Sequence, residues 1–182
     1  MLPASLAVGV RGQDVSDVLA AVLRVNACPL TIVLEDFSGG PLRLEVLRDG
    51  ERYLNTAGAV EDECYRLDAP PGTPCRWRQS LLITQDGVVA ASVSLIWLPG
   101  RLPAAARREL EQAAEPAGRV LERFAMRRHD RRALATSQID EVTGRVAAVL
   151  ASAVCVVGGQ KVAIAGESVL RDFAGSLTAQ TV

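Results

Sequence analysis

The sequence predicts an α+β fold in which a mostly antiparallel β-sheet is combined with separate helical segments. Asp86-Gly87 stands between two alternating, β-rich runs, and Gly158-Gly159 stands between two more. Two-residue turns of this kind join neighbouring antiparallel strands, so both pairs of runs are expected to form hairpins. Apolar residues also recur at helical spacing in two other parts of the chain, residues 14–35 and 103–124.

The first elements along the chain are two short helices. Asp14 or Ser16 is a suitable N-cap for a helix that runs to about Arg24. Pro29 is a favourable opening residue for a second helix, Leu30 to Glu35, which is expected to end before Ser38-Gly39-Gly40.

A strand is expected next, from Pro41 to Leu47, because apolar and charged residues alternate there. Asp49-Gly50 predicts a turn and Arg52 to Asn55 a weaker strand. The acidic run Glu61-Asp62-Glu63 is interpreted as solvated, and residues 69–74 as a loop.

The hairpin at residues 75–98 has a register that can be read from its turn. It pairs Thr84 with Val89 and Arg78 with Leu95, and it places Arg78 at one end of a mostly apolar face. A guanidinium in that position needs a partner. Two interpretations remain open: a structural ion pair, which the hairpin alone favours because buried charges are usually paired, or a socket for an anionic ligand.

The segment after this hairpin predicts two helices, which begin at Pro103 and Pro116. A helical pair inserted between strands either covers a site or only packs on the sheet. The basic cluster Arg127–Arg132 either binds an anion or acidic partner or, as favoured here, forms a solvated helix end. His129 is the only histidine, which argues against a His-dependent triad or a His-rich metal site.

The last hairpin places a second ionisable group on an apolar face. Glu167 shares its side of the strand with Ala163, Ala165 and Val169. Desolvation there is expected to raise the pKa of Glu167, and the alanines leave space beside it. Glu167 and Arg78 either pair with each other or bracket a small, dry pocket. In the second case Arg78 would bind a carboxylate and Glu167 would move a proton.

Composition limits the possible functions. A chain of 182 residues suits a single domain spanning residues 1–182, and a net charge of −1 argues against a nucleic-acid binder. The four cysteines have no metal-type spacing, so free thiols and no metal are expected. The first residues, MLPASLAVGVRG, make a poor signal peptide, and no apolar run is long enough for a membrane span. A cytoplasmic protein is therefore expected.

Several short motifs occur in an order that resembles the chorismate pyruvate-lyase family, including its actinobacterial branch, over roughly residues 20–173. They are Pro29-Leu30-Thr31, Arg76-Trp77-Arg78 before an apolar strand, Arg101-Leu102-Pro103, Pro116-Ala117-Gly118-Arg119, and Gly158-Gly159-Gln160 before a strand that ends in Glu167.

The resemblance implies a specific fold and activity. Helices would lie on one face of the sheet, and a helix-turn-helix flap would cover a buried ligand pocket. The enzyme would remove pyruvate from chorismate to give 4-hydroxybenzoate without a cofactor. Arg78 would hold a carboxylate and Glu167 would assist proton transfer. The other substrate-binding residues would be Leu30, Thr31, Ala117 and Gly118.

Some positions depart from the family pattern. Ser94 stands where a charged residue is expected, the strand before the last turn carries Ser152 to Cys155 in place of basic residues, and Gly166 replaces a larger residue. Two other functions therefore stay open: a non-catalytic domain of the same fold that binds a small aromatic or enol acid, and a related lyase with another substrate in secondary metabolism. Domains that share this fold also serve as effector domains of bacterial transcription regulators.

Overall fold

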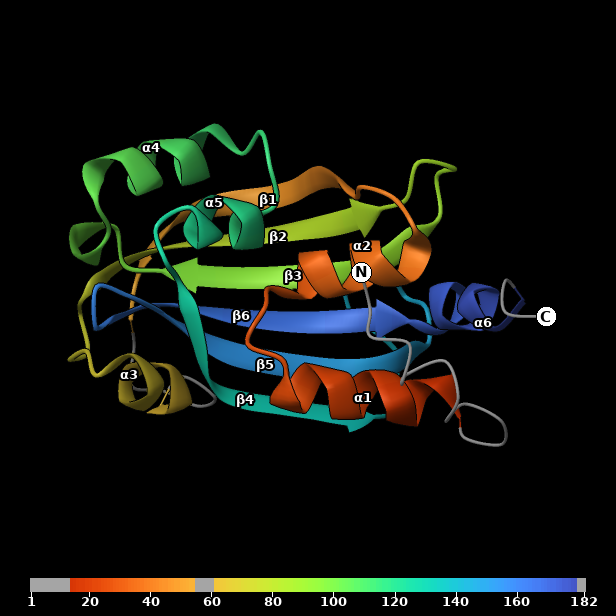
Figure 1. Cartoon of the computed structure of the whole chain (residues 1–182). Helices are drawn as coiled ribbons and strands as arrows, with labels where there is room; N and C mark the ends of the chain where they lie inside the picture. Colours follow the sequence, from red (N-terminus) through yellow and green to blue (C-terminus); the bar gives the residue numbers. More distant parts are fainter. Residues whose placement is uncertain (1–13, 55–60, 180–182) are drawn as a thin grey trace.

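The computed structural model describes residues 14–54 and 61–179, and its centre is one six-stranded antiparallel sheet in the order β1-β2-β3-β6-β5-β4 (Figure 1). The N-terminal stretch used for the signal-peptide expectation lies outside the described residues. The strands are β1 (Arg43–Tyr53), β2 (Pro74–Ile83), β3 (Val89–Trp97), β4 (Arg127–Ala135), β5 (Ala147–Val157) and β6 (Gln160–Leu170). The helices are α1 (Val15–Val25), α2 (Leu30–Ser38), α3 (Glu61–Leu67), α4 (Ala104–Gln112), α5 (Ala117–Glu122) and α6 (Arg171–Ala179), with a 3₁₀ turn at Pro99–Arg101.

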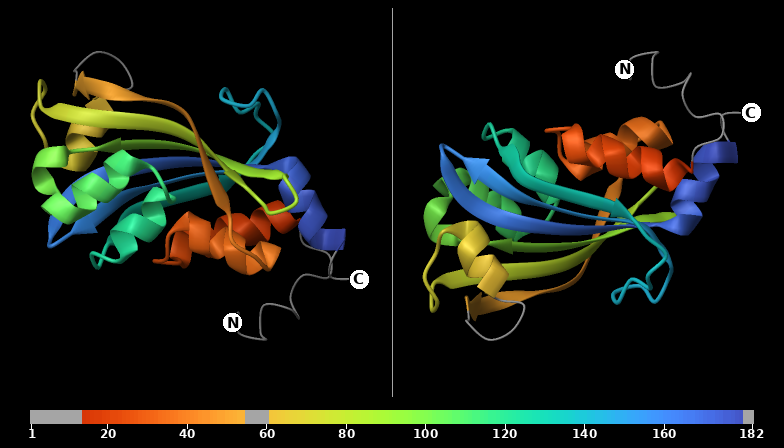
Figure 2. Two further views of the ribbon diagram at one scale, coloured as in Figure 1. Left: turned by 90° about the horizontal axis from the view of Figure 1, so that it is seen from above. Right: turned by 90° about the horizontal axis from the view of Figure 1, so that it is seen from below.

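The two faces of the sheet are covered unequally. Four helices, α1, α2, α4 and α5, lie on one face, whereas α3 packs on the other (Figure 2). The predicted antiparallel α+β fold is thus confirmed, with α3 as an additional helix on the second face. The α4–α5 segment lies between β3 and β4 in the chain, at the position expected for a flap.

The central hairpin has the predicted register over most of its length. Arg78 is opposite Leu95, and Leu82 is opposite Ala91. The expected pairing of Thr84 with Val89 is wrong, because a bulge shifts the register and places Ile83 opposite Val89. In the last hairpin, Val157 pairs with Gln160 across the predicted Gly158-Gly159 turn.

The Asp49-Gly50 turn is not formed, because β1 continues through both residues. Gly50 lies opposite Trp77 on β2, and a Cβ atom at Gly50 would come within 3.0 Å of the indole nitrogen. The glycine therefore serves close packing against an aromatic ring, where sequence alone suggests a chain reversal.

The helix ends follow the sequence closely. Asp14 caps α1 by accepting a hydrogen bond from the Ser16 N–H at 2.8 Å. The second helix begins after Pro29, as expected, but it runs to Ser38, beyond the expected end at Glu35, and Gly39, with a φ of 73°, caps it. The acidic run at residues 61–63 opens α3, where Glu63 forms an ion pair with Arg52 at 2.8 Å.

The basic cluster is the largest difference from expectation. Arg127–Arg132 begins the edge strand β4, so the favoured interpretation as a helix end is wrong. Side chains alternate along a strand, and this alternation leaves Arg127 and His129 exposed while it buries Arg128 beneath the helices. All four cysteines are free, and none of the described helices is long and apolar enough to cross a membrane.

Candidate functional site

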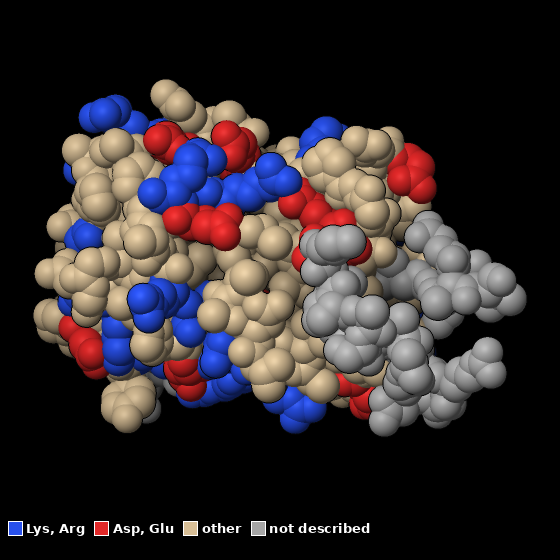
Figure 3. Space-filling view, in the orientation of Figure 1, with Lys and Arg blue, Asp and Glu red and all other residues tan. Residues whose placement is uncertain are grey.

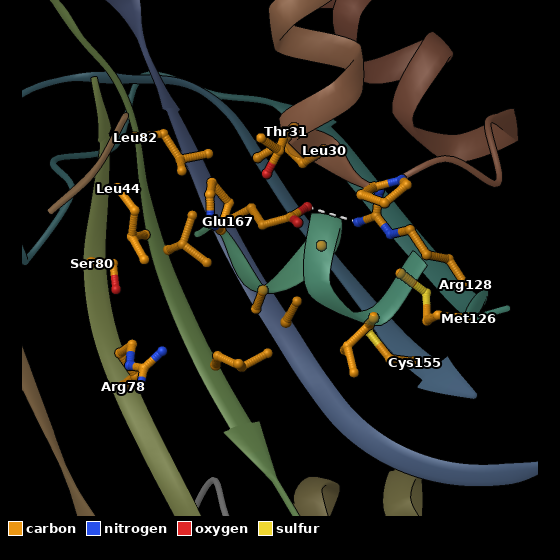
Figure 4. A pocket seen from close by; sticks show the side chains of 18 residues that line it. Leu30, Thr31, Leu44, Arg78, Ser80, Leu82, Met126, Arg128, Cys155 and Glu167 are labelled. Carbon is orange, nitrogen blue, oxygen red and sulfur yellow. Dashed lines mark hydrogen bonds and ion pairs between the residues drawn. The ribbon is translucent and has the colours of Figure 1, made fainter. Parts of the chain in front are cut away.

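A small cavity lies between the helix-covered face of the sheet and the starts of α2 and α5 (Figure 4). Its volume is about 50 Å³, room for a few water-sized molecules. Most of its lining is apolar, with a few polar groups at the edges. The polar lining residues are Thr31, Arg78, Ser80, Arg128, Cys155 and Glu167, and the apolar ones include Leu44, Leu82, Leu95, Leu121 and Met126.

Arg78 lies at one end of this cavity and is only 3% exposed. Its Nη2 donates to the Leu110 carbonyl of α4 at 2.7 Å, and its guanidinium stacks on the Trp97 ring at 5.3 Å. Asp49 is 3.8 Å away and half-exposed. The Nε of Arg78 is buried without a hydrogen-bond partner. Burial lowers the pKa of Arg78, whereas Asp49 acts in the opposite direction, and the guanidinium remains charged.

Glu167 lies toward the other end, where its partner is Arg128 and not Arg78. The Arg128 Nη2 donates to Glu167 Oε2 at 2.7 Å, and both side chains are buried. A second nitrogen of Arg128 donates to the Cys28 carbonyl, between α1 and α2, at 3.2 Å. Desolvation raises the pKa of Glu167, and the Arg128 charge counteracts part of that rise.

The sheet register explains why Arg78 and Glu167 do not touch. Leu95 on β3 lies opposite both Arg78 and Ala165, and Glu167 is two residues beyond Ala165. Two strand spacings and one pleat repeat place the Cα atoms of Arg78 and Glu167 about 12 Å apart. A void therefore separates the two ionisable groups, and the interpretation in which they form an ion pair with each other is wrong.

Two helix starts form the wall of the cavity that faces the sheet. The second helix begins with Leu30 and Thr31, the fifth with Ala117 and Gly118, and neither has a side-chain cap. Backbone N–H groups in the first turn of a helix have no partner within the helix, so they favour an acceptor or a negative charge. The starts of the two helices pack tightly, because a Cβ atom at Gly118 would come within 2.6 Å of Pro29.

The cavity thus brings together every residue that the sequence assigned to the site: Arg78, Glu167, Leu30, Thr31, Ala117 and Gly118. Arg128 was missed, because it belongs to the basic cluster interpreted as solvated. No local pattern singles it out, because residues 127–132 form an unbroken run of charged and polar side chains. Ser94 and Gly166, two of the departures from the family pattern, are opposite each other and face away from this cavity, whereas Cys155, from the third, lines it.

The charged and acidic residues of the cavity are Arg78, Arg128 and Glu167, which offer positive charge, hydrogen bonds and one carboxyl group. Burial raises the pKa of Cys155 to about 12, so this thiol stays protonated and a poor nucleophile. Among the described residues no group of three His, Cys, Asp or Glu side chains is arranged to hold a metal ion.

A second, wider hollow lies on the opposite face of the sheet, and its walls are linked by hydrogen bonds. Asp140, in the β4–β5 connection, accepts from Ser92 at 2.7 Å and from the Thr143 N–H and hydroxyl at 2.9 and 2.6 Å. Burial raises the pKa of Asp140, but these hydrogen bonds outweigh that effect and lower it overall. All of these groups are satisfied, so the hollow is the weaker candidate for a site.

Comparison with known proteins identifies relatives by fold. No protein-family profile matches the sequence, and no curated protein sequence matches it. The effector domain of PhnF from Mycobacterium smegmatis superposes with a TM-score of 0.60 at 13% identity, covering 81% of this chain and 91% of that domain. PhnF itself gives a TM-score of 0.59 at 13% identity, covering 81% of this chain and 66% of its own.

A further neighbour is the ligand-binding domain of a protein assigned to the GntR family of transcriptional regulators, from Bordetella bronchiseptica. Its TM-score is 0.53 at 13% identity, with 72% of this chain and 86% of that domain covered. The chain therefore has the fold of the ligand-binding domains of such regulators. At this level of identity the likeness is one of fold.

Proposed function

We propose that this protein binds a small organic acid in the cavity between the sheet and the starts of α2 and α5. The observation that carries the proposal is that the buried guanidinium of Arg78 is incompletely hydrogen-bonded. Its charge is buried and one of its donors, Nε, has no partner. A buried polar group without a partner is costly, and a carboxylate accepts two parallel hydrogen bonds from a guanidinium.

The other residues that line the cavity indicate the chemistry of the rest of the ligand. Leu44, Leu82 and Leu95 make the cavity floor apolar, which suits a hydrocarbon or aromatic skeleton. At the far end Arg128 fixes the position of Glu167, whose carboxyl group faces the cavity. Glu167 therefore suits a ligand that carries a hydroxyl or another polar group opposite its carboxylate.

The comparisons support binding more directly than catalysis, because the neighbours bear the names of effector and ligand-binding domains. One of them is a regulator of which this chain covers about two thirds. We therefore place the non-catalytic, acid-binding function first. A role as the effector domain of a DNA-binding regulator belongs to the same proposal.

Calorimetric titration with 4-hydroxybenzoate, benzoate and pyruvate tests the proposal. Binding of an aromatic acid should disappear in Arg78→Met and persist in Arg43→Met. Arg43 is the matched control, because it is an exposed arginine on the neighbouring strand whose partner is Glu45 at 3.3 Å. Equal affinity in both variants, or binding of none of the three acids by the wild type, would contradict the proposal.

Chorismate pyruvate-lyase activity is the second candidate function, and a specific observation favours it. Arg78 and Glu167 line one mostly apolar cavity, and desolvation favours the protonated form of Glu167, which a general acid requires. Incubation with chorismate should then yield 4-hydroxybenzoate and pyruvate, and Glu167→Gln should lower the rate of product formation without abolishing product binding. If the wild type forms no product while it binds 4-hydroxybenzoate, the domain is a binding module only.

A further inference from the structure

The cavity is closed on the side where α2 meets α5. Its volume of about 50 Å³ accommodates a few water-sized molecules, so an organic acid fits only after the covering elements move apart. The contact between Gly118 and Pro29 leaves no room for a methyl group. Movement of α5 away from α2 would therefore open the cavity on this side.

One ion pair joins these two helices across the contact. Arg119 Nη2 on α5 lies 2.5 Å from Glu35 Oε2 on α2, and Figure 3 shows acidic and basic side chains interleaved over this region. Glu35 is held in place, because its other oxygen accepts from the Leu42 N–H at 2.8 Å and its side chain is only 11% exposed. The Arg119 side chain is 42% exposed, so solvent and salt reach the ion pair from that end.

The neighbouring helix, α4, is attached to the sheet through strand β2. Leu110 on α4 accepts from Arg78, and Glu111 lies 3.5 Å from Arg76. Ala113 and Ala125, which flank α5, both have positive φ values, 53° and 54°. These two residues can act as hinges. A small change in their backbone dihedral angles would rotate the six-residue helix α5 as a unit.

We propose that the Arg119–Glu35 ion pair is a latch that holds α5 closed over the cavity and sets how often it opens. This inference goes beyond the proposed function, since it concerns the motion of the flap whatever ligand the cavity takes. Breaking the pair should increase the opening of α5 and leave the rest of the fold intact.

Two buried cysteines allow opening to be measured without any ligand. Cys155 lines the cavity and packs with Val120 and Leu121 of α5, whereas Cys75 is buried in the separate cluster under α3. A thiol reacts as its thiolate, and burial keeps both thiols protonated. Each is therefore modified only when its own part of the structure opens, and Cys75 is an internal control.

The experiment is time-resolved modification with iodoacetamide, followed for each cysteine by peptide mass spectrometry. Arg119→Gln should speed the modification of Cys155 by about fivefold and leave Cys75 unchanged, the size expected when a partly exposed ion pair is lost. The matched control is Arg108→Gln, since Arg108 is an exposed arginine on the adjacent helix α4 and takes no part in the contact between Arg119 and Glu35.

The salt dependence of the Cys155 modification rate provides a second measurement. Raising the salt concentration screens an ion pair with one exposed end, so it should speed the modification of wild-type Cys155 and have little effect in Arg119→Gln. The proposal is overturned if Arg119→Gln leaves the Cys155 rate unchanged, or if it speeds both cysteines equally, because the variant then loosens the whole fold. Failure to detect any ligand would count only against the proposed function.

Discussion

The two buried arginines of the cavity differ in how their charges are balanced. Arg128 has a carboxylate at 2.7 Å and a backbone carbonyl at 3.2 Å. Arg78 has a carbonyl, an aromatic ring and a distant, half-exposed carboxylate, and it retains a buried donor without a partner. A satisfied buried ion pair fixes structure, whereas an incompletely satisfied charge is available to a ligand. Four experiments test this contrast.

Replacement of Arg128 should have the largest effect on stability. Arg128→Met leaves Glu167 buried without its partner, so the free energy of unfolding should fall by about 3–5 kcal/mol in urea denaturation. The double variant Arg128→Met/Glu167→Leu removes both charges and should recover much of that loss. A single variant as stable as the wild type would show that the pair does not hold the fold together.

Replacement of Arg78 should act mainly on binding. Arg78→Met should weaken binding of 4-hydroxybenzoate by about 10- to 100-fold, the range for losing hydrogen bonds to a charged group. Its free energy of unfolding should change far less than that of Arg128→Met, because a donor without a partner disappears with the charge. Calorimetry and urea denaturation on the same sample separate the two effects, and a large loss of stability with unchanged affinity would reverse the assignment.

The pH dependence of stability should report on Glu167. Burial raises its pKa in the folded protein, so the folded state holds this proton more tightly than the unfolded state does. The resulting stabilisation is fully present below the unfolded-state pKa, about 4.3, and is lost as the pH rises through the folded-state value. The free energy of unfolding of the wild type minus that of Glu167→Gln should therefore decrease from pH 4 toward neutrality. A difference that is flat, or that increases, would show that Arg128 dominates the titration.

The smallest effect is expected at an exposed arginine. Arg123→Gln removes ion pairs to Glu109 and Glu115, all of them partly exposed, and should leave the midpoint of urea denaturation unchanged within error. A clear shift of that midpoint would mean that ion pairs within the flap contribute to the fold, and the contrast between buried and exposed arginines would weaken.

Sequence reasoning predicted residues that line the candidate cavity, but not how their charges are balanced. Turn residues and alternation placed Arg78 and Glu167 on apolar strand faces, and the ordered motifs added the two helix starts. Arg128 was missed because a buried charge within a run of charges carries no apolar signal, so the pattern at residues 127–132 resembles a solvated segment. The role of Arg128 depends on the position of β4 at the edge of the sheet, which is set by contacts between residues far apart in the sequence.

The error at Gly50 has a related cause. The pair Asp49-Gly50 has the composition of a turn, and only the strand pairing shows that Trp77 occupies the space above the glycine. The bulge that displaces Thr84 from Val89 is likewise set by how the two strands meet. Local composition therefore predicts where the chain bends less well than it predicts which face of a strand is buried.

The packing of α1 against α6 has a practical consequence for work on this protein. The two helices meet at one end of the sheet, whereas α4 lies at the opposite end (Figure 1). Dyes or surface attachments joined to an exposed residue of α6, such as Asp172, should therefore leave the α4–α5 flap unobstructed. Immobilised protein should then exchange small molecules as freely as protein in solution.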